Sequence, residues 1–164
     1  MIKRPFVHEV FISCVLTYIS RYNTIQELEV TLYKIIITKW ALDSYLELKH
    51  KRTFSDQEFK EVLKPDVLLL RHYPNSPKFK NAKFWGNAKV QGGMPISNGF
   101  KMKWHHIGSG QIQLRLSIAM ISSQAILCQG YIKHNEKEDK LQIAIFSLYM
   151  DYILKNKHNE VGKL

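Results

Sequence analysis

Acidic residues are missing from a long continuous stretch in the middle of this sequence. The chain of 164 residues contains 14 Asp and Glu residues, yet none lies in the stretch from Val67 to Asn135. Enzymes that cleave nucleic acids with metal ions hold those ions with clustered carboxylates. Because the Pro65-Asp66-Val67 segment is not followed by a Glu-x-Lys pattern, the sequence excludes a metal-dependent nuclease motif at this place.

Cysteine is scarce as well, and common cofactor motifs are absent. Cys14 and Cys128 are far apart and form no C-x-x-C pattern, which is typical of small buried side chains in a reducing compartment. Neither G-x-x-x-x-G-K-[ST] nor G-x-G-x-x-G occurs, and no apolar stretch has the length of a membrane span. We therefore expect a cytoplasmic protein that binds no membrane, metal or cofactor.

Positive charge is concentrated in the stretch that lacks acids. The net charge is +10, and nine basic residues fall in this stretch, whereas the other 15 nearly balance the 14 acids. Such a concentration favours a polyanionic partner, for example a nucleic acid. The nine residues are Arg71, Lys78, Lys80, Lys83, Lys89, Lys101, Lys103, Arg115 and Lys133.

Residues 100–116 alternate between apolar and polar side chains, which is typical of a β-hairpin. The flexible residues 108–110 supply a three-residue turn, and the resulting register places Lys103 opposite Arg115. Like charges in this position destabilise a sheet, whereas a phosphate between them would accept charge-assisted hydrogen bonds. We therefore expect Lys101, Lys103 and Arg115 to bind a phosphate.

His105 lies on the same predicted face as these cations. An unperturbed histidine pKa of about 6.5 suits acid–base catalysis, and neighbouring cations favour the neutral, basic form. His106 would face the core in a regular strand. Because the 2′-hydroxyl of RNA can attack the adjacent phosphate, cations, a base and an acid suffice for cleavage without a metal. The predicted catalytic residues are therefore Lys103, His105 and Arg115.

The first third of the sequence predicts helices. Apolar residues at helical spacing indicate one helix over residues 6–21 and a longer one over residues 24–50, the latter opened by a capping-box pattern. A second capping pattern at Ser55 starts a short helix, and Pro65 is expected to end it, because the residue before a proline leaves the helical region.

The last third of the sequence predicts further strands and a helix. Residues 124–133 form a strand after a turn at Ser122-Ser123, and residues 134–140 are polar and turn-like. Residues 141–146 fit either a strand or a helix, and we favour a strand followed by a C-terminal helix to about residue 157. The expected fold class is α+β, with N-terminal helices followed by a small antiparallel β-sheet and a C-terminal helix.

Residues 113–146 resemble the C-terminal half of YafO-type toxins of bacterial toxin–antitoxin pairs. The shared features are a Q-L-R run, a short turn, a hydrophobic strand ending in C-Q-G, and an I-A-I strand. FKMKWHHI at 100–107 occupies the place of a strand ending in an H-x-H histidine pair, and FWGN at 84–87 is similar to an F-G-[RN]-D stretch. The GYIKH segment also resembles HigB-type relatives, and the match covers residues 84–157.

This resemblance implies a RelE/ParE-like sheet domain at residues 65–164, preceded by a helical extension at residues 1–64. It also implies an mRNA endoribonuclease that acts on the ribosome and is neutralised by a cognate antitoxin protein. Arg115 takes the place of the strand arginine of this family. Because the chain has adjacent histidines instead of H-x-H, either His105 or His106 takes the place of the histidine, so His106 joins the predicted catalytic residues.

Further RNA contacts are predicted around the hairpin. The same cationic surface also fits a non-catalytic RNA- or ribosome-binding module, or a basic protein that binds an acidic partner. The sequence gives no prediction of the oligomeric state. The predicted RNA-binding residues are Lys101, Lys133, Lys83, Lys89 and Tyr131.

Overall fold

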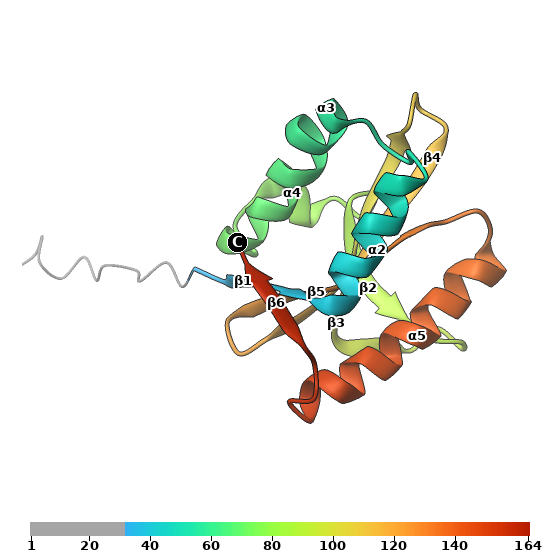
Figure 1. Cartoon of the computed structure of the whole chain (residues 1–164). Helices are drawn as coiled ribbons and strands as arrows, with labels where there is room; N and C mark the ends of the chain where they lie inside the picture. The colour runs from blue at the N-terminus through green and yellow to red at the C-terminus, as the bar shows by residue number, and fades with distance from the viewer. Residues whose placement is uncertain (1–31) are drawn as a thin grey trace, which may run out of the picture. The chain divides into compact units, whose positions relative to one another are not determined.

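The computed structural model describes residues 32–164, and their centre is a six-stranded β-sheet (Figure 1). The strands are β1 (Lys34–Thr38), β2 (Trp85–Lys89), β3 (Pro95–Ile107), β4 (Ile112–Ile121), β5 (Gln124–Ile132) and β6 (Glu160–Lys163). Their order in the sheet is β2-β3-β4-β5-β1-β6. β1 runs parallel to β5, while the four other neighbouring pairs are antiparallel.

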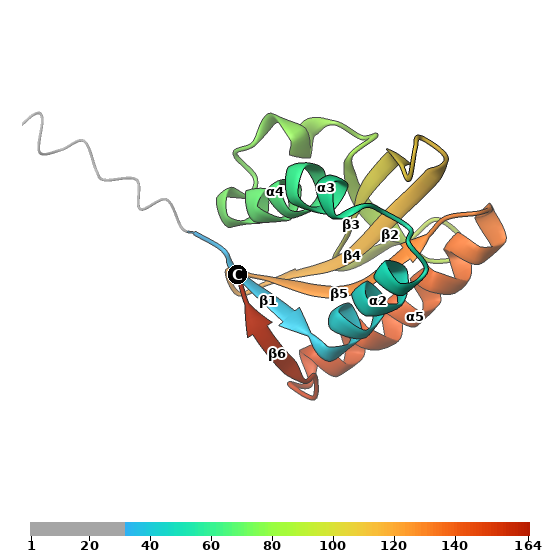
Figure 2. The same cartoon turned by 45° about the horizontal axis from the view of Figure 1, so that its top comes forward.

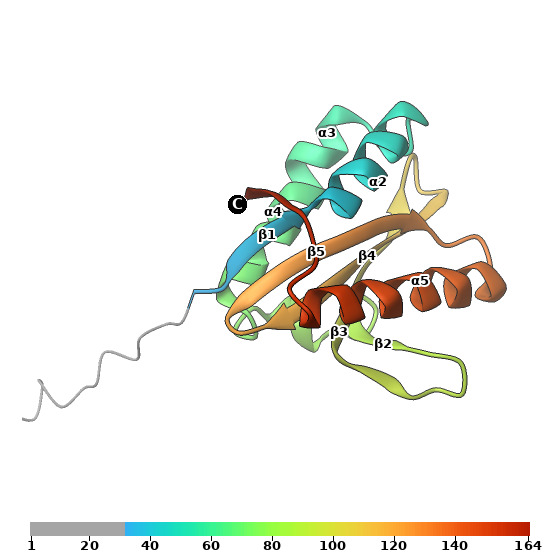
Figure 3. The ribbon, with the colours of Figure 1, turned by 60° about the horizontal axis from the view of Figure 1, so that its bottom comes forward.

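Helices cover both faces of this sheet. Figure 3 shows α5 on one face, with α2, α3 and α4 on the other. Residues 56–72 form one nearly continuous helical segment that includes a π-helical part. The elements are α2 (Lys39–His50), α3 (Asp56–Glu58), the π-helical η1 (Phe59–Leu63), α4 (Lys64–Leu68), the 3-10 helices η2 (Leu69–His72) and η3 (Pro77–Lys80), and α5 (Glu136–Leu154).

Each face of the sheet has its own apolar core. The face beneath α2, α3 and α4 buries Ile35, Met102 and Leu114 together with side chains of the helices. The opposite face packs Phe146 and other α5 residues against the sheet. Apolar burial stabilises a fold by about 25 cal/mol per Å². The second of these cores therefore holds α5 in a fixed position on the sheet.

The junction between β1 and α2 depends on one threonine. Thr38 is fully buried, and its hydroxyl donates to the Leu127 carbonyl of β5 at 2.8 Å. The same oxygen accepts from the Ala41 amide at 3.2 Å and thereby caps the first turn of α2. Capping of this kind stabilises a helix by about 1 kcal/mol. The predicted capping box at Ser55 is also confirmed, because Ser55 and Glu58 exchange both hydrogen bonds.

The predicted fold class is wrong, because the sheet is mixed and not purely antiparallel. Residues 34–38, which were expected to lie in the 24–50 helix, form β1 between β5 and β6 (Figure 2). Ile35 and Ile36 are buried on opposite faces of the sheet, and β-branched residues favour such a strand. The helix predicted over residues 6–21 lies outside the described residues.

The C-terminal part of the fold prediction is also wrong. Residues 141–146 belong to α5, which begins after an Asn135 cap, and the strand β6 follows this helix. Ile143, Phe146, Met150 and Ile153 face the sheet at helical spacing. The predicted division at residue 64 has no counterpart in the described part of the chain, because β1 and α2 precede it and share the sheet and core with the rest.

Pro65 does not end the helical segment as predicted. It lies in the first turn of α4, directly after the π-helical turn η1. Inside a continuous helix a proline removes one backbone hydrogen bond and its ring crowds the preceding turn, and the π-helical turn η1 directly before Pro65 is the local distortion that accommodates it. The helix therefore continues and places Asp66 in the interior, where it is buried.

In residues 32–164 no helix has the length and hydropathy needed to cross a membrane.

Candidate functional site

The predicted cationic face of the hairpin is present in the structure. β3 and β4 pair Lys103 with Arg115, as predicted, and Lys101 with Ser117. β5 adds Tyr131 opposite Arg115. These side chains lie on the α5 side of the sheet, because Lys101 and Tyr131 both contact Asp139 of α5. The turn is longer than predicted: Ile107 pairs with Ile112, so the turn contains four residues.

A β-bulge interrupts β3 at the two histidines. Trp104 pairs with Leu114 and Ile107 pairs with Ile112, so two residues, His105 and His106, lie opposite one residue of β4. In contrast to the regular strand that was predicted, His106 is exposed and does not face the core. The two imidazole ring centres are 6.4 Å apart. Bulges often redirect side chains next to active sites, and this one presents two neighbouring imidazoles.

The hydrogen bonding of His105 defines which of its nitrogens can act as a base. Its Nε2 lies 2.7 Å from the backbone carbonyl of Lys83. Because a carbonyl oxygen only accepts, Nε2 must carry the hydrogen and donate it. In the neutral ring the lone pair is therefore on Nδ1. The loop before β2 thus fixes both the orientation and the tautomer of His105.

Lys103 stands beside the histidines with no acidic partner. Its Nζ donates to the Ala82 carbonyl at 2.5 Å, and none of the carboxylates in residues 32–164 forms an ion pair with it. Partial burial lowers the pKa of Lys103, and the nearby charges of Lys101 and Arg115 lower it further. Lys103 is therefore a cation that gains stability from an anionic ligand and gives up its proton more easily than an exposed lysine.

Arg115 is buried in the sheet, with only 3% of its surface exposed. One terminal nitrogen donates to the carbonyls of Trp104 and Leu114 at 3.2 and 3.0 Å, and the other donates to Gln113 Oε1 at 3.0 Å. Burial lowers the pKa of its guanidinium, which still stays charged at neutral pH. Since Trp104 directly precedes the bulge, Arg115 holds the backbone that presents the two histidines.

Asp139 is the important residue that the sequence pattern did not indicate. It is buried in the first turns of α5, where its Oδ2 accepts from Lys101 at 3.1 Å and its Oδ1 accepts from the Tyr131 hydroxyl at 2.8 Å. Burial alone would raise the pKa of Asp139, but the bonds from Tyr131 and Lys101 outweigh it and lower the pKa. Burial and Asp139 together raise the pKa of Tyr131. Tyr131 therefore orients this carboxylate.

The acid-free stretch is partly neutralised by acids that flank it in the sequence. Lys78 pairs with Asp66 at 2.5 Å, Lys101 with Asp139, and Lys133 with Glu136. Three of the nine basic residues therefore already have acidic partners, and the positive face is smaller than the sequence suggested. Within the described range, the other six form no ion pair: Arg71, Lys80, Lys83, Lys89, Lys103 and Arg115.

The remaining predicted RNA-binding residues are at different distances from the histidines. Lys83 is exposed, and its carbonyl holds His105, so it belongs to the same site. Lys89 pairs with Pro95 at the opposite end of β3 from the bulge, so the structure does not bring it to the site. Lys133 directly follows β5, and its backbone amide donates to the Gln113 carbonyl at 2.8 Å.

Asp139 should make the stability of the protein depend on pH in the acid range. Because its folded pKa is lowered, its stabilising effect is complete above the unfolded value of about 3.9 and is lost as the pH falls through the folded value. We expect Asp139→Asn to unfold in urea with a midpoint that changes less between pH 5 and pH 2.5 than the wild-type midpoint does. If the urea midpoint changes with pH by the same amount in both proteins, this role of Asp139 is contradicted.

The site offers no evident place for a metal ion. Among the residues that the structure describes, no group of three or more His, Cys, Asp or Glu side chains lies close enough to hold one. Cys128 is buried against the α5 core, and burial raises the pKa of its thiol.

The chain matches no protein-family model and no curated protein sequence.

Proposed function

We propose that this protein is an endoribonuclease that cleaves RNA without a metal ion. The observation that carries this proposal is the β-bulge, which presents His105 and His106 side by side, while Lys103 and His105 bind the consecutive carbonyls of Ala82 and Lys83. Lys103 has no acidic partner in residues 32–164 and would gain one in a phosphate. A base, an acid and a cation around one phosphodiester are the groups that RNA cleavage requires.

The proposed reaction uses the RNA 2′-hydroxyl as nucleophile. His105 Nδ1 takes the hydroxyl proton while the 2′-oxygen attacks phosphorus and forms the new P–O bond. His106, in its protonated form, gives a proton to the 5′-oxygen as the P–O5′ bond breaks. The products are a 2′,3′-cyclic phosphate and a 5′-hydroxyl. Lys103 stabilises the negative charge that develops on the phosphoryl oxygens.

Arg115 supports this reaction from within the sheet. Its three hydrogen bonds hold the Trp104 and Leu114 carbonyls and the Gln113 side chain, and these residues surround the bulge. Arg115 therefore positions the histidines, and its charge adds to the positive potential at the phosphate. This role differs from the direct phosphate contact that the sequence predicts, because the guanidinium is buried.

We further propose that the substrate is mRNA on the ribosome, and that a cognate antitoxin protein inhibits the enzyme as part of a toxin–antitoxin pair. This part of the proposal rests on the resemblance of residues 113–146 to YafO-type toxins. The mixed sheet departs from the antiparallel sheet that the resemblance implies. The Ile143-Ala144-Ile145 run, a strand in the resemblance, also lies in α5. The support therefore comes from the segments that form β3, β4 and β5 and from the histidine pair, and not from the architecture.

A non-catalytic RNA-binding module is the second candidate function. The observation that favours it is that Lys103 and His105 already donate to the backbone carbonyls of Ala82 and Lys83. In such a module the histidine would serve to fix the loop and no bond would break. Both candidates require the same phosphate contact, so they differ only in catalysis.

Replacing Lys103 should weaken RNA binding, because the substitution removes one contact with a phosphate. Removing one such contact makes the slope of log K against log salt concentration shallower by about 0.7 for single strands. We expect Lys103→Met to show this decrease in fluorescence-anisotropy titrations with single-stranded RNA. Lys60→Met is the matched control, because Lys60 is exposed in η1 and forms no ion pair with a described residue. Equal effects of the two substitutions would contradict the assigned contact.

A further inference from the structure

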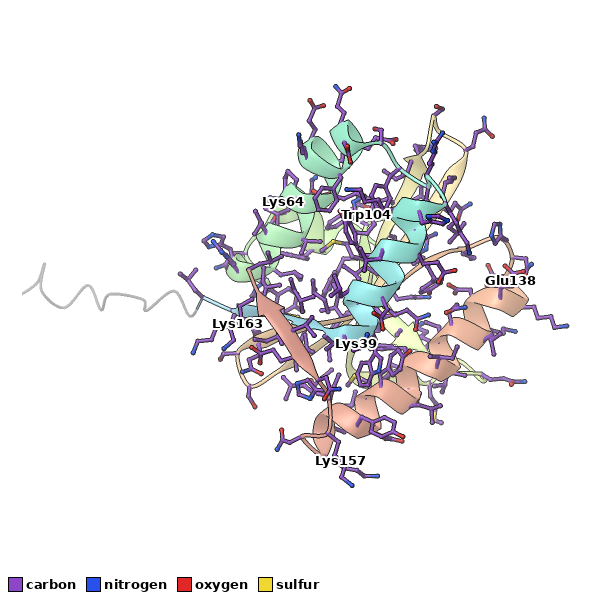
Figure 4. All side chains as sticks on the ribbon, viewed as in Figure 1. Lys39, Lys64, Trp104, Glu138, Lys157 and Lys163 are labelled. Atoms are coloured by element: carbon purple, nitrogen blue, oxygen red, sulfur yellow. The ribbon has the colours of Figure 1, made fainter. Side chains whose placement is uncertain are left out.

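A polar groove lies between α2 and α5, on the side of α5 away from β3. Its volume is about 430 Å³, which is within the range of small-molecule sites. The floor is β5, including Gln129 and Tyr131, and the two walls come from α2 and α5. Figure 4 shows Glu138, one of the lining residues, at the end of α5 far from Lys157. Tyr131 is shared with the cationic site, because its hydroxyl binds Asp139.

The groove has an aromatic wall. Trp40 of α2 and Tyr149 of α5 both line it, and their rings stack at 4.0 Å with an interplanar angle of 9°. Both side chains are only half-buried. Stacking on aromatic side chains contributes about 1–3 kcal/mol per nucleobase, so a planar ring entering the groove could extend this stack.

Two glutamines give the groove an unsatisfied hydrogen-bonding group. Gln129 donates through Nε2 to Gln142 Oε1 of α5, while Gln129 Oε1 is buried and has no hydrogen-bond partner. An unpaired buried acceptor costs about 1–3 kcal/mol. A ligand donor would remove this cost once the Gln129 side chain turns its buried oxygen toward the groove. The groove therefore favours a ligand with a hydrogen-bond donor.

The charges at the groove select against phosphate. Three carboxylates, those of Asp43, Glu47 and Glu138, line it and outnumber its one lysine, Lys51, which lines it together with His134. Asp43 and Glu47 are already paired with Lys39 and Lys51. Glu138 forms no ion pair with any residue of the described range. Carboxylates repel a phosphate but accept hydrogen bonds from exocyclic amino groups, as they do from cytosine N4.

We propose that this groove binds a nucleobase with an exocyclic amino group, next to the phosphate site and on the same RNA strand. The base extends the stack of Trp40 and Tyr149, and its amino group donates to Gln129 Oε1 and Glu138. Uracil has no exocyclic amino group, and its one ring donor, N3–H, lies between two carbonyl oxygens that Gln129 Oε1 and Glu138 would repel, so uracil binds more weakly. This inference deepens the proposed ribonuclease function and rests on it for the identity of the ligand as RNA. It gives the enzyme a preference for the bases near the cut.

The test is a titration with free nucleosides, which requires neither cleavage nor phosphate binding. We expect cytidine to shift the Trp40 indole N–H resonance in ¹H–¹⁵N spectra, and uridine, which differs at the amino position, to bind at least about tenfold more weakly. Gln129→Leu should lower cytidine affinity by about 3–10-fold, which corresponds to one hydrogen bond. Lys60→Met serves as the control and should leave cytidine binding unchanged.

The outcomes separate this inference from the proposed function. Equal shifts with cytidine and uridine, or no shift of the Trp40 resonance with either, would overturn the nucleobase site, even if the protein cleaves RNA. Selective cytidine binding by a protein that cleaves no RNA would support the groove as a nucleoside site and would count against the ribonuclease. An unchanged affinity of Gln129→Leu, with a folded spectrum, would overturn the assigned hydrogen bond.

Discussion

Substitution of His105 by alanine is expected to lower the rate of RNA cleavage by about 10²–10⁴-fold, the usual contribution of a positioned acid or base. RNA affinity should change by less than about threefold, because the phosphate is held by Lys103. The rate should fall because His105 Nδ1 is the proposed base: Nε2 donates to the Lys83 carbonyl, which leaves Nδ1 as the only basic atom of the neutral ring. Single-turnover cleavage of mRNA in a translation reaction and anisotropy binding measure the two quantities.

His50→Ala is the matched control for this substitution. His50 is exposed at the end of α2, and in the described residues no hydrogen bond joins its side chain to Lys103, His105 or His106. It should retain the wild-type cleavage rate. If His105→Ala cleaves as fast as His50→Ala, His105 is not the base. If the wild-type protein binds RNA but cleaves none, the non-catalytic binding module is the correct function.

Lys101→Met is expected to reduce the free energy of unfolding by about 3 kcal/mol. Removing one partner of a buried ion pair leaves an uncompensated charge, at a cost of about 3–5 kcal/mol. Only 16% of the Lys101 side chain and 11% of the Asp139 side chain are exposed to solvent. The lower end of this range applies because Tyr131 continues to donate to Asp139. Urea denaturation at pH 7 measures the change.

The double substitution Lys101→Met with Asp139→Asn should recover most of this loss. It removes both charges, and the asparagine oxygen still accepts from Tyr131. Lys39→Met is the control, because Lys39 forms an exposed ion pair with Asp43, and such pairs contribute only about 0–1 kcal/mol. A Lys101→Met effect as small as that of Lys39→Met, or no recovery in the double variant, would contradict the buried pair.

This pair also decides how Lys101 takes part in RNA binding. A lysine that neutralises Asp139 adds little net charge to the surface. The double variant, which loses one positive and one negative charge, should therefore bind RNA about as tightly as the wild-type protein. Lys103 and Lys83, which have no acidic partner in residues 32–164, supply the attraction instead.

The hairpin could be predicted because its signal is local. Alternation over residues 100–116 sets which side chains share a face, and the Lys103–Arg115 pairing follows from the turn. The bulge could not be predicted, since two adjacent histidines fit a regular strand equally well. The bulge depends on the hydrogen bond that Arg115 donates to the Trp104 carbonyl and on the one that His105 donates to the Lys83 carbonyl. Arg115 and Lys83 lie in separate segments of the sequence.

β1 and α5 show why the wider fold was mispredicted. Residues 35–37 fit both a helix and a strand, and their parallel pairing with β5 joins segments that are far apart in the sequence. In α5, Leu141 and Leu148 are exposed whereas Phe146 faces the sheet, so the apolar residues of this segment do not mark one helical face. Because the wrong element was favoured there, Asp139 appeared to belong to a polar turn, and its contact with Lys101 was not foreseen.

End analysis of the RNA fragments is the most direct test of metal-independent cleavage. The purified protein is added to a translation reaction, and the ends of the cut mRNA are determined. Attack by the 2′-hydroxyl predicts a 2′,3′-cyclic phosphate and a 5′-hydroxyl, and a 2′-deoxy substitution at the cut nucleotide should abolish that cut. Fragments with 3′-hydroxyl and 5′-phosphate ends, or mRNA that stays intact, would contradict the account.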